Sequence, residues 1–141
     1  MAFIPRTIQT RCASMALIAP GYIEQRFRND VTLDRAGFEE NRRVRAELGG
    51  QGPYVMHTVI PEGIDFDLDI TMQNHFEPER GRSGLVALAV TASDAMGEAV
   101  AKLYFSYFPP DFQIKVFSTE AQAKAWLAER RPDERRPKGA G

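Results

Sequence analysis

Alternating apolar and polar positions near the start of the chain predict a β-hairpin. Residues 7–18 are rich in β-branched and apolar side chains, and a second run at residues 22–28 follows the turn-forming tripeptide Ala-Pro-Gly. In this second run Ile23, Gln25 and Phe27 alternate with charged residues, so one face is mainly apolar and the other faces water. We expect the two runs to pair as the first two strands of a sheet.

A helical pattern follows the hairpin. Residues 32–50 open on Thr32, a side chain that favours helix N-termini, and close on Gly49 and Gly50, which favour a helix end. Apolar or small residues recur at helical spacing on the face that we expect to meet the core, namely Leu33, Gly37, Val44 and Leu48.

The second half of the chain alternates predicted strands and helices. Residues 53–60, 84–93 and 112–117 are short apolar runs that predict strands, and the second of them is apolar enough to be central in the sheet. A helix is predicted after a cap at Ser93, ending before Pro109, and another over residues 118–131. The face predicted to be buried on the first of these helices contains Met96, Val100, Leu103 and Tyr107.

Residues 63–76, GIDFDLDITMQNHF, allow more than one interpretation. A calcium loop that starts at Asp65 would need glycine at its sixth position and glutamate at its twelfth, and Ile70 and Phe76 occupy them. An extended strand would place Asp65, Asp67 and Asp69 on one face, whereas a helix would form an apolar stripe of Leu68, Met72 and Phe76. We favour the helix, because the later residues do not alternate and early aspartates suit a helix N-terminus. Binding of a divalent ion by the aspartates with His75 is the minor alternative.

The order of these elements predicts an α/β fold. It consists of one domain in which a mixed sheet of about five strands, including the N-terminal hairpin, is flanked by about four helices. The domain would occupy residues 1–129. Residues 130–141 contain two prolines and no large apolar side chain, which predicts a disordered basic tail that either solubilises the protein or contacts an acidic partner.

Composition narrows the functional classes. The chain has 141 residues, 43% of them hydrophobic, and a net charge of −1, which gives no overall attraction to nucleic acid. We expect no membrane span, because the apolar run at residues 13–20 is shorter than the roughly 20 residues that a span needs. The single cysteine, Cys12, is expected in the core and suits a cytoplasmic protein, since it can form no internal disulfide.

The residues suggest binding more than catalysis. We expect no catalytic residues, no metal site and no cofactor, because we find no phosphate-binding glycine motif and no set of nucleophile, base and orienting group. His57 lies inside a predicted strand, where a structural role is expected. Aromatic residues gather between the second predicted helix and the last strand, and four of them could line a pocket: Tyr104, Tyr107, Phe108 and Phe112.

The stretch PPDFQIKVFSTEAQAKAWL at residues 109–127, together with the order of elements, resembles the STAS-type, or SpoIIAA-like, superfamily, in particular its small stand-alone bacterial members. The resemblance covers about residues 7–129 and implies that residues 63–76 form the second helix. The best-known members bind a protein partner and are switched by phosphorylation of a serine at the start of that helix. This chain has no hydroxyl residue between Thr58 and Thr71, so the resemblance implies binding without that switch.

Our leading interpretation is therefore a non-enzymatic, cytoplasmic protein-interaction or regulatory domain, with a homodimer also plausible. The residues expected to contact the partner are Glu62, Asp65, Asp67 and Asp69. The alternative is a module that binds a small molecule or lipid through the aromatic residues near the last strand, and an enzyme is a third possibility.

Overall fold

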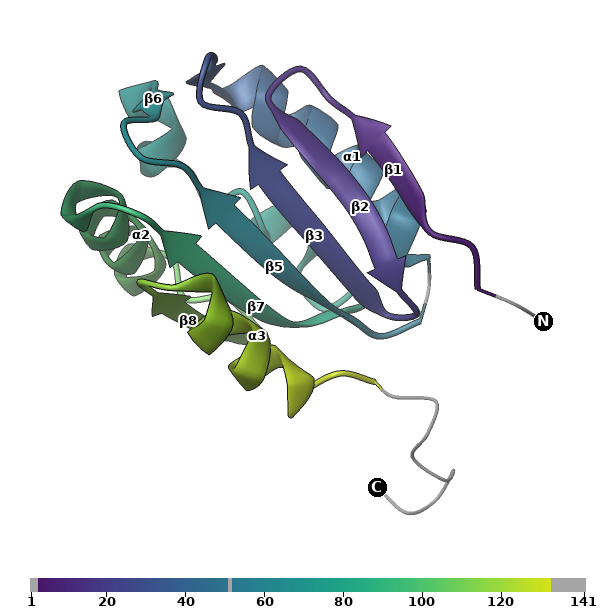
Figure 1. Ribbon diagram of the computed structural model, residues 1–141. Helices are drawn as coiled ribbons and strands as arrows, with labels where there is room; N and C mark the ends of the chain where they lie inside the picture. Colours follow the sequence, from purple (N-terminus) through teal and green to yellow (C-terminus); the bar gives the residue numbers. More distant parts are fainter. Residues whose placement is uncertain (1–2, 51, 133–141) are drawn as a thin grey trace.

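The computed structural model describes residues 3–50 and 52–132, which form a mixed sheet with helices on both faces (Figure 1). The six strands lie in the order β1-β2-β3-β5-β7-β8. Their bounds are β1 Arg6–Gln9, β2 Ala13–Ala19, β3 Tyr22–Phe27, β5 Tyr54–Ile60, β7 Leu85–Ala92 and β8 Gln113–Phe117. The first three strands pair antiparallel, and β3, β5, β7 and β8 pair parallel. The predicted α/β fold with a mixed sheet is confirmed, with more strands than the sequence indicated.

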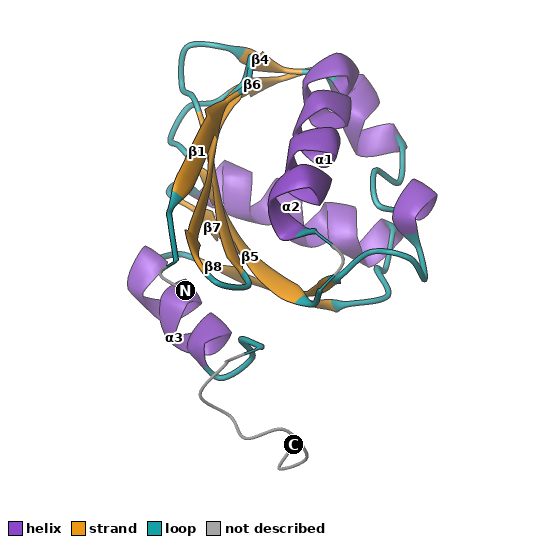
Figure 2. Cartoon of the chain, turned by 90° about the vertical axis from the view of Figure 1, so that its right-hand side faces the viewer, coloured by secondary structure: helices purple, strands orange, loops and turns teal. Residues whose placement is uncertain are grey.

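Three α-helices cover the sheet in the described residues, one fewer than the sequence predicted. They are α1 Arg35–Gly49, α2 Ala95–Tyr107 and α3 Glu120–Ala128. Figure 2 shows α1 and α2 on one face of the sheet and α3 on the other. Each face has its own apolar core: Met56 and Leu88 belong to the cluster under α1 and α2, whereas Val55 packs with Ala123 and Leu127 of α3.

The N-terminal hairpin contains one more strand than predicted. The chain turns at Thr10–Cys12, where the Thr10 amide donates to the carbonyl of Ala13 (2.8 Å), and this turn divides residues 7–18 between β1 and β2. Cys12 is fully buried, as expected of a core residue, although it lies in this turn and not in a strand.

The helix predicted over residues 63–76 does not form. This part of the chain contains β6 (Asp65–Phe66), which pairs with β4 (Thr32–Leu33), and the 3-10 helix η1 (Leu68–Met72); a second 3-10 helix, η2 (Glu77–Glu79), follows. The reason is tertiary packing: the apolar residues at alternate positions of the extended part pack in a cluster with Leu33, which holds the backbone extended there. Leu68 and Met72, which a helical stripe would bury, are each 74% exposed.

The start of α1 and the buried face of α2 also differ from the sequence predictions. Asp34 caps α1 by accepting from the Gly37 amide (2.9 Å), and Asp94 caps α2 in the same way through Gly97 (2.8 Å). Thr32 lies in β4 and Ser93 precedes the α2 cap. On α2, three of the four residues predicted to be buried are exposed, namely Met96, Leu103 and Tyr107.

The chain beyond α3 is described as far as Pro132. The guanidinium of Arg130 lies over the Trp126 ring at 4.1 Å, and that of Arg131 lies over the Tyr22 ring at 5.2 Å. Residues 133–141, which make up most of the predicted tail, lie outside the described residues. Among the described residues no helix is both long and apolar enough to cross a membrane.

Candidate functional site

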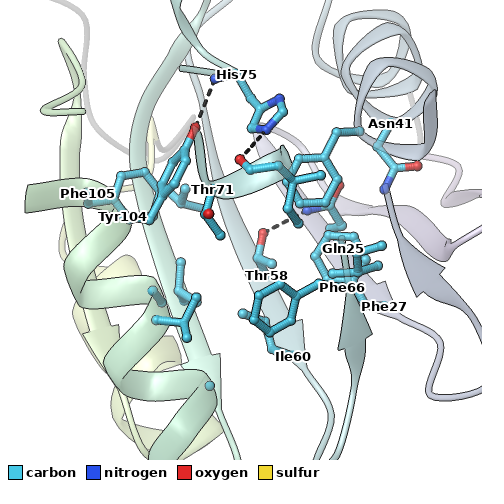
Figure 3. A pocket seen from close by; sticks show the side chains of 18 of the residues that line it. Gln25, Phe27, Asn41, Thr58, Ile60, Phe66, Thr71, His75, Tyr104 and Phe105 are labelled. Carbon is cyan, nitrogen blue, oxygen red and sulfur yellow. Dashed lines mark hydrogen bonds between the residues drawn. The ribbon is translucent and has the colours of Figure 1, made fainter. Parts of the chain in front are cut away.

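A cavity of about 150 Å³ lies between the sheet and the two helices α1 and α2. Its floor comes from β3, β5 and β7, its sides from α1 and α2, and the irregular segment at residues 61–83 supplies the remaining wall (Figure 3). Apolar side chains make up most of the lining: Phe27, Leu33, Phe38, Met56, Ile60, Ile64, Phe66, Ile70, Phe76, Leu88, Val90, Val100, Ala101 and Phe105.

Two polar side chains interrupt the apolar floor. Gln25 of β3 and Thr58 of β5 are register partners in the parallel pair, and both side chains point to the cavity side of the sheet (Figure 3). Gln25 Nε2 donates to Thr58 Oγ1 at 3.1 Å. The two residues are only 7% and 6% exposed, so this polar pair is held inside an otherwise apolar cavity.

Helix α1 contributes two further buried polar residues to the lining. Asn41 Nδ2 donates to Cys12 Sγ at 3.4 Å, while Asn41 Oδ1 is buried without a hydrogen-bond partner among the described residues. Arg45 donates from Nε to the Tyr54 hydroxyl (3.2 Å) and forms an ion pair with Glu79. Burial lowers the pKa of Arg45, and the ion pair with Glu79 compensates its charge.

The wall formed by residues 61–83 is attached to α2 through Tyr104. The Tyr104 hydroxyl accepts from the His75 amide (2.9 Å) and donates to the carbonyl of Gln73 (2.7 Å). The His75 ring bonds through Nε2 to the carbonyl of Ile70 (2.7 Å), so it holds η1 in place. Burial lowers the pKa of His75 and raises the pKa of Tyr104, which favours the neutral form of both rings.

The aromatic residues that the sequence singled out as a possible pocket are not brought together in this cavity. Tyr104 lines it, whereas Tyr107 is 72% exposed on the outer face of α2. Phe108 contacts the Tyr104 ring (5.3 Å between centroids) and Phe112 contacts Phe76 (5.1 Å), and both lie outside the lining.

The acidic residues predicted to bind a partner form an exposed group beside the cavity wall. Glu62, Asp65, Asp67 and Asp69 are all exposed, and the Asp65 carboxylate accepts from the Thr32 hydroxyl at 2.8 Å. Among the described residues, no three histidine, cysteine or acidic side chains are placed to hold a metal ion together. His75 turns its ring to the Ile70 carbonyl.

His57 lies on the opposite face of the sheet, under α3. It is fully buried, its Nε2 is 2.7 Å from Thr91 Oγ1, and its Nδ1 has no hydrogen-bond partner among the described residues. Burial lowers the pKa of His57. Its place in the core agrees with the structural role expected from the sequence.

Two of the cavity residues that the sequence did not single out, Gln25 and Thr58, share one signal. Gln25 alternates with Ile23 and Phe27, and Thr58 follows Met56 by two residues, so both polar residues occupy inward positions of their strands. A polar residue at a predicted core position is unusual unless it serves a function.

Comparison with known proteins gives one structural likeness. A solved structure of an uncharacterised protein of the DUF3478 family, with a SpoIIAA-like fold, from Shewanella loihica PV-4 is 14% identical to this chain, with a TM-score of 0.49. The match covers 88% of this chain and 92% of that one. No protein-family model and no curated protein sequence matches the chain.

Proposed function

We propose that this protein binds a small, mainly apolar molecule in the cavity between the sheet, α1 and α2, without chemical turnover. The observation that carries the proposal is the cavity itself, about 150 Å³ and lined mostly by apolar side chains. Protein interiors are normally packed with few voids larger than a water molecule. An engineered cavity of about this volume with an apolar lining binds benzene.

The cost of such a cavity to folding supports a role in binding. An apolar cavity leaves its lining without the packing contacts of a filled core, so it lowers the free energy of unfolding relative to a fully packed core. A bound ligand would offset it.

The volume also limits the size of the ligand. Pockets for drug-sized molecules have about 300–1,000 Å³, twice this volume or more. A single ring or a short branched chain suits the cavity, whereas a complete lipid would need the wall at residues 61–83 to move. Of the two ligand classes that the sequence analysis considered, a small molecule and a lipid, the volume therefore favours the small molecule.

A cavity-filling substitution tests the proposal. We expect benzene to bind the wild-type protein saturably and to shift NMR signals of residues around the cavity. Ala101→Leu places a larger side chain in the cavity, because Ala101 is buried in its lining, and should abolish binding. Ala99→Leu is the matched control on the exposed side of the same helix and should bind benzene like the wild type. Saturable binding that Ala101→Leu leaves intact would place the ligand elsewhere and contradict the proposal.

A second candidate function rests on the exposed segment beside the cavity. Leu68 and Met72 are each 74% exposed, and Leu68 lies in the sequence between the exposed residues Asp67 and Asp69. An apolar centre with an acidic rim is complementary to a protein surface that has a basic rim around an apolar pocket. This would be the non-enzymatic protein interaction expected from the sequence.

The second function predicts a partner whose binding weakens with salt. Replacing Asp65, Asp67 and Asp69 by asparagine should reduce recovery of that partner from host extract, and the same should hold for Leu68→Asp. Ala101→Leu should leave recovery unchanged, because it alters only the cavity. If every recovered protein is retained equally by the asparagine variant, this function is excluded.

A further inference from the structure

We infer that the ligand carries a hydrogen-bonding group, such as a hydroxyl or a carboxamide, which the Gln25–Thr58 pair recognises at the floor of the cavity. The inference rests on the proposed function, since it specifies the chemistry of the molecule that would occupy this cavity. It starts from a polar pair that packing alone does not explain.

The pair has unused hydrogen-bonding capacity. Gln25 makes one side-chain hydrogen bond to the described residues, from Nε2 to Thr58, so its Oε1 accepts no hydrogen bond from them. Thr58 accepts that bond, and its own hydroxyl proton remains available. The pair therefore offers one acceptor and one donor to a ligand, and it does so in either orientation of the glutamine amide.

Asn41 places another amide group in a second wall of the cavity. Its Oδ1 has no partner among the described residues, but this oxygen has almost no accessible surface, so a ligand in the cavity does not reach it. Buried polar groups without partners are costly, and nearly all those in proteins are paired. The polar group that a ligand can reach is therefore the Gln25–Thr58 pair, whose unused acceptor and donor favour a ligand with an O–H or N–H group.

The charges around the cavity favour a neutral ligand. Arg45 is the buried cation of the lining, and Glu79 and the Tyr54 hydroxyl already engage its guanidinium. Burying a carboxylate ligand without a free cation would carry a large desolvation cost. Arg42 also lines the cavity but is only partly buried, so its charge stays in contact with solvent.

Phenol and toluene provide a matched pair of probes, since they have nearly the same shape and toluene has a methyl group in place of the phenol hydroxyl. We expect phenol to bind the wild-type protein more tightly than toluene, although water solvates phenol better. The Kd values are measured by NMR titration, with the side-chain amide signals of Gln25 and Asn41 as reporters. Those amide signals should shift with phenol and shift much less with toluene.

Two variants identify the recognising groups. Thr58→Val keeps the side-chain shape and removes the hydroxyl, and Gln25→Leu removes the amide. In each, the ratio of the toluene Kd to the phenol Kd should fall about tenfold, because the phenol hydroxyl loses a buried partner. If Gln25→Leu fails to fold, Thr58→Val still decides the question, since its shape is nearly unchanged.

The outcomes separate this inference from the proposed function. Toluene binding as tightly as phenol to the wild type, or an unchanged ratio in Thr58→Val, would overturn the inference and leave cavity binding standing. Benzoate binding more tightly than phenol would also overturn it, because a charged ligand paired with Arg42 would then be preferred. If no ring-sized probe binds, the proposed function fails as well.

Discussion

At the scale of single residues, Arg45 shows how a charge is held inside this protein. Its side chain is 6% exposed, and it pairs with Glu79 of η2, packs over the Phe76 ring at 5.2 Å and donates to Tyr54. The ion pair thus connects α1 to the wall of the cavity. A buried charge that loses its partner is much more costly than the pair itself is favourable.

Glu79→Ala should therefore destabilise the protein strongly. We expect the free energy of unfolding to fall by about 3–5 kcal/mol, because the substitution leaves the buried Arg45 uncompensated. Chemical denaturation measures this change. Glu77→Ala is the control, since it breaks an exposed ion pair with Arg80 and should cost at most about 1 kcal/mol. Equal effects of the two substitutions would show that Arg45 has access to water.

The lowered pKa of buried His57 leads to a prediction of how the stability of the protein depends on pH. Burial lowers its pKa in the folded protein below the value of about 6.5 in an unfolded chain. Below pH 6.5 the unfolded state therefore binds more protons than the folded state. The contribution of His57 to the free energy of unfolding is complete above pH 6.5 and is lost as the pH falls toward the pKa of His57 in the folded protein. His75 acts in the same direction.

We expect the free energy of unfolding to decrease below pH 6.5, by up to about 1.4 kcal/mol per pH unit for each buried histidine. The groups that affect the His57 charge are Glu24, Arg26, Glu120 and Lys124, and the two acids only partly oppose the effect of burial. His57→Gln should reduce the slope measured by denaturation between pH 6.5 and 5. A slope identical to that of the wild type would mean that His57 does not take up a proton on unfolding.

At the scale of elements, the periodic segments were predictable and the irregular wall was not. Strands β5 and β7 and the three α-helices follow from apolar runs and from the glycine and proline residues around them. The prediction for residues 61–83 was wrong because the structure of this segment depends on contacts between residues distant in the sequence. Examples are the pairing of β6 with β4 and the ion pair between Arg45 and Glu79. Local propensity does not encode such contacts.

The buried face of α2 was predicted wrongly for a different reason. This helix has apolar residues on nearly every side, so periodicity cannot decide which stripe faces the sheet. The buried side contains Gly97 and Ala101, with Tyr104 and Phe105 partly buried beside them. Small residues let the helix approach β7 closely: a Cβ on Gly97 would lie 3.4 Å from that of Ala92.

Tyr104→Phe tests how the wall is attached to α2. Removal of the hydroxyl breaks the bonds to the His75 amide and the Gln73 carbonyl, so we expect a loss of about 1–2 kcal/mol in stability. Hydrogen exchange should become faster at residues 73–76 and stay unchanged in β5. Tyr107→Phe is the control, because Tyr107 is exposed on the same helix. Faster exchange throughout the sheet would instead indicate that the wall opens only with global unfolding.

At the scale of the whole molecule, the sequence predicted the class of fold better than the candidate site. A mixed sheet with helices on both faces follows from the order of the elements, because short connections leave few ways to arrange them. The cavity depends on side chains from strands β3, β4, β5 and β7, from two helices and from an irregular segment. The inward positions of Gln25 and Thr58 were visible in the sequence, but only their pairing in the structure shows that they share one cavity.

Substitutions on the two faces of the sheet should lower stability alike but affect ligand binding differently. Leu127 is fully buried between α3 and the sheet, and Leu88 is 2% exposed in the lining of the cavity on the opposite face. Leu127→Ala and Leu88→Ala should each lower the free energy of unfolding by about 2–5 kcal/mol, since both remove a well-packed side chain. Only Leu88→Ala enlarges the cavity.

Ligand binding should therefore respond to one variant and not to the other. With phenol as the probe, the Kd of Leu127→Ala should match that of the wild type at a temperature where both are folded, whereas Leu88→Ala should bind larger rings that the wild type excludes. The matched loss of stability ensures that a difference in binding reflects the cavity and not partial unfolding. A change in Kd caused by Leu127→Ala would mean that α3 influences the cavity through the sheet, and the two faces would then form one coupled unit.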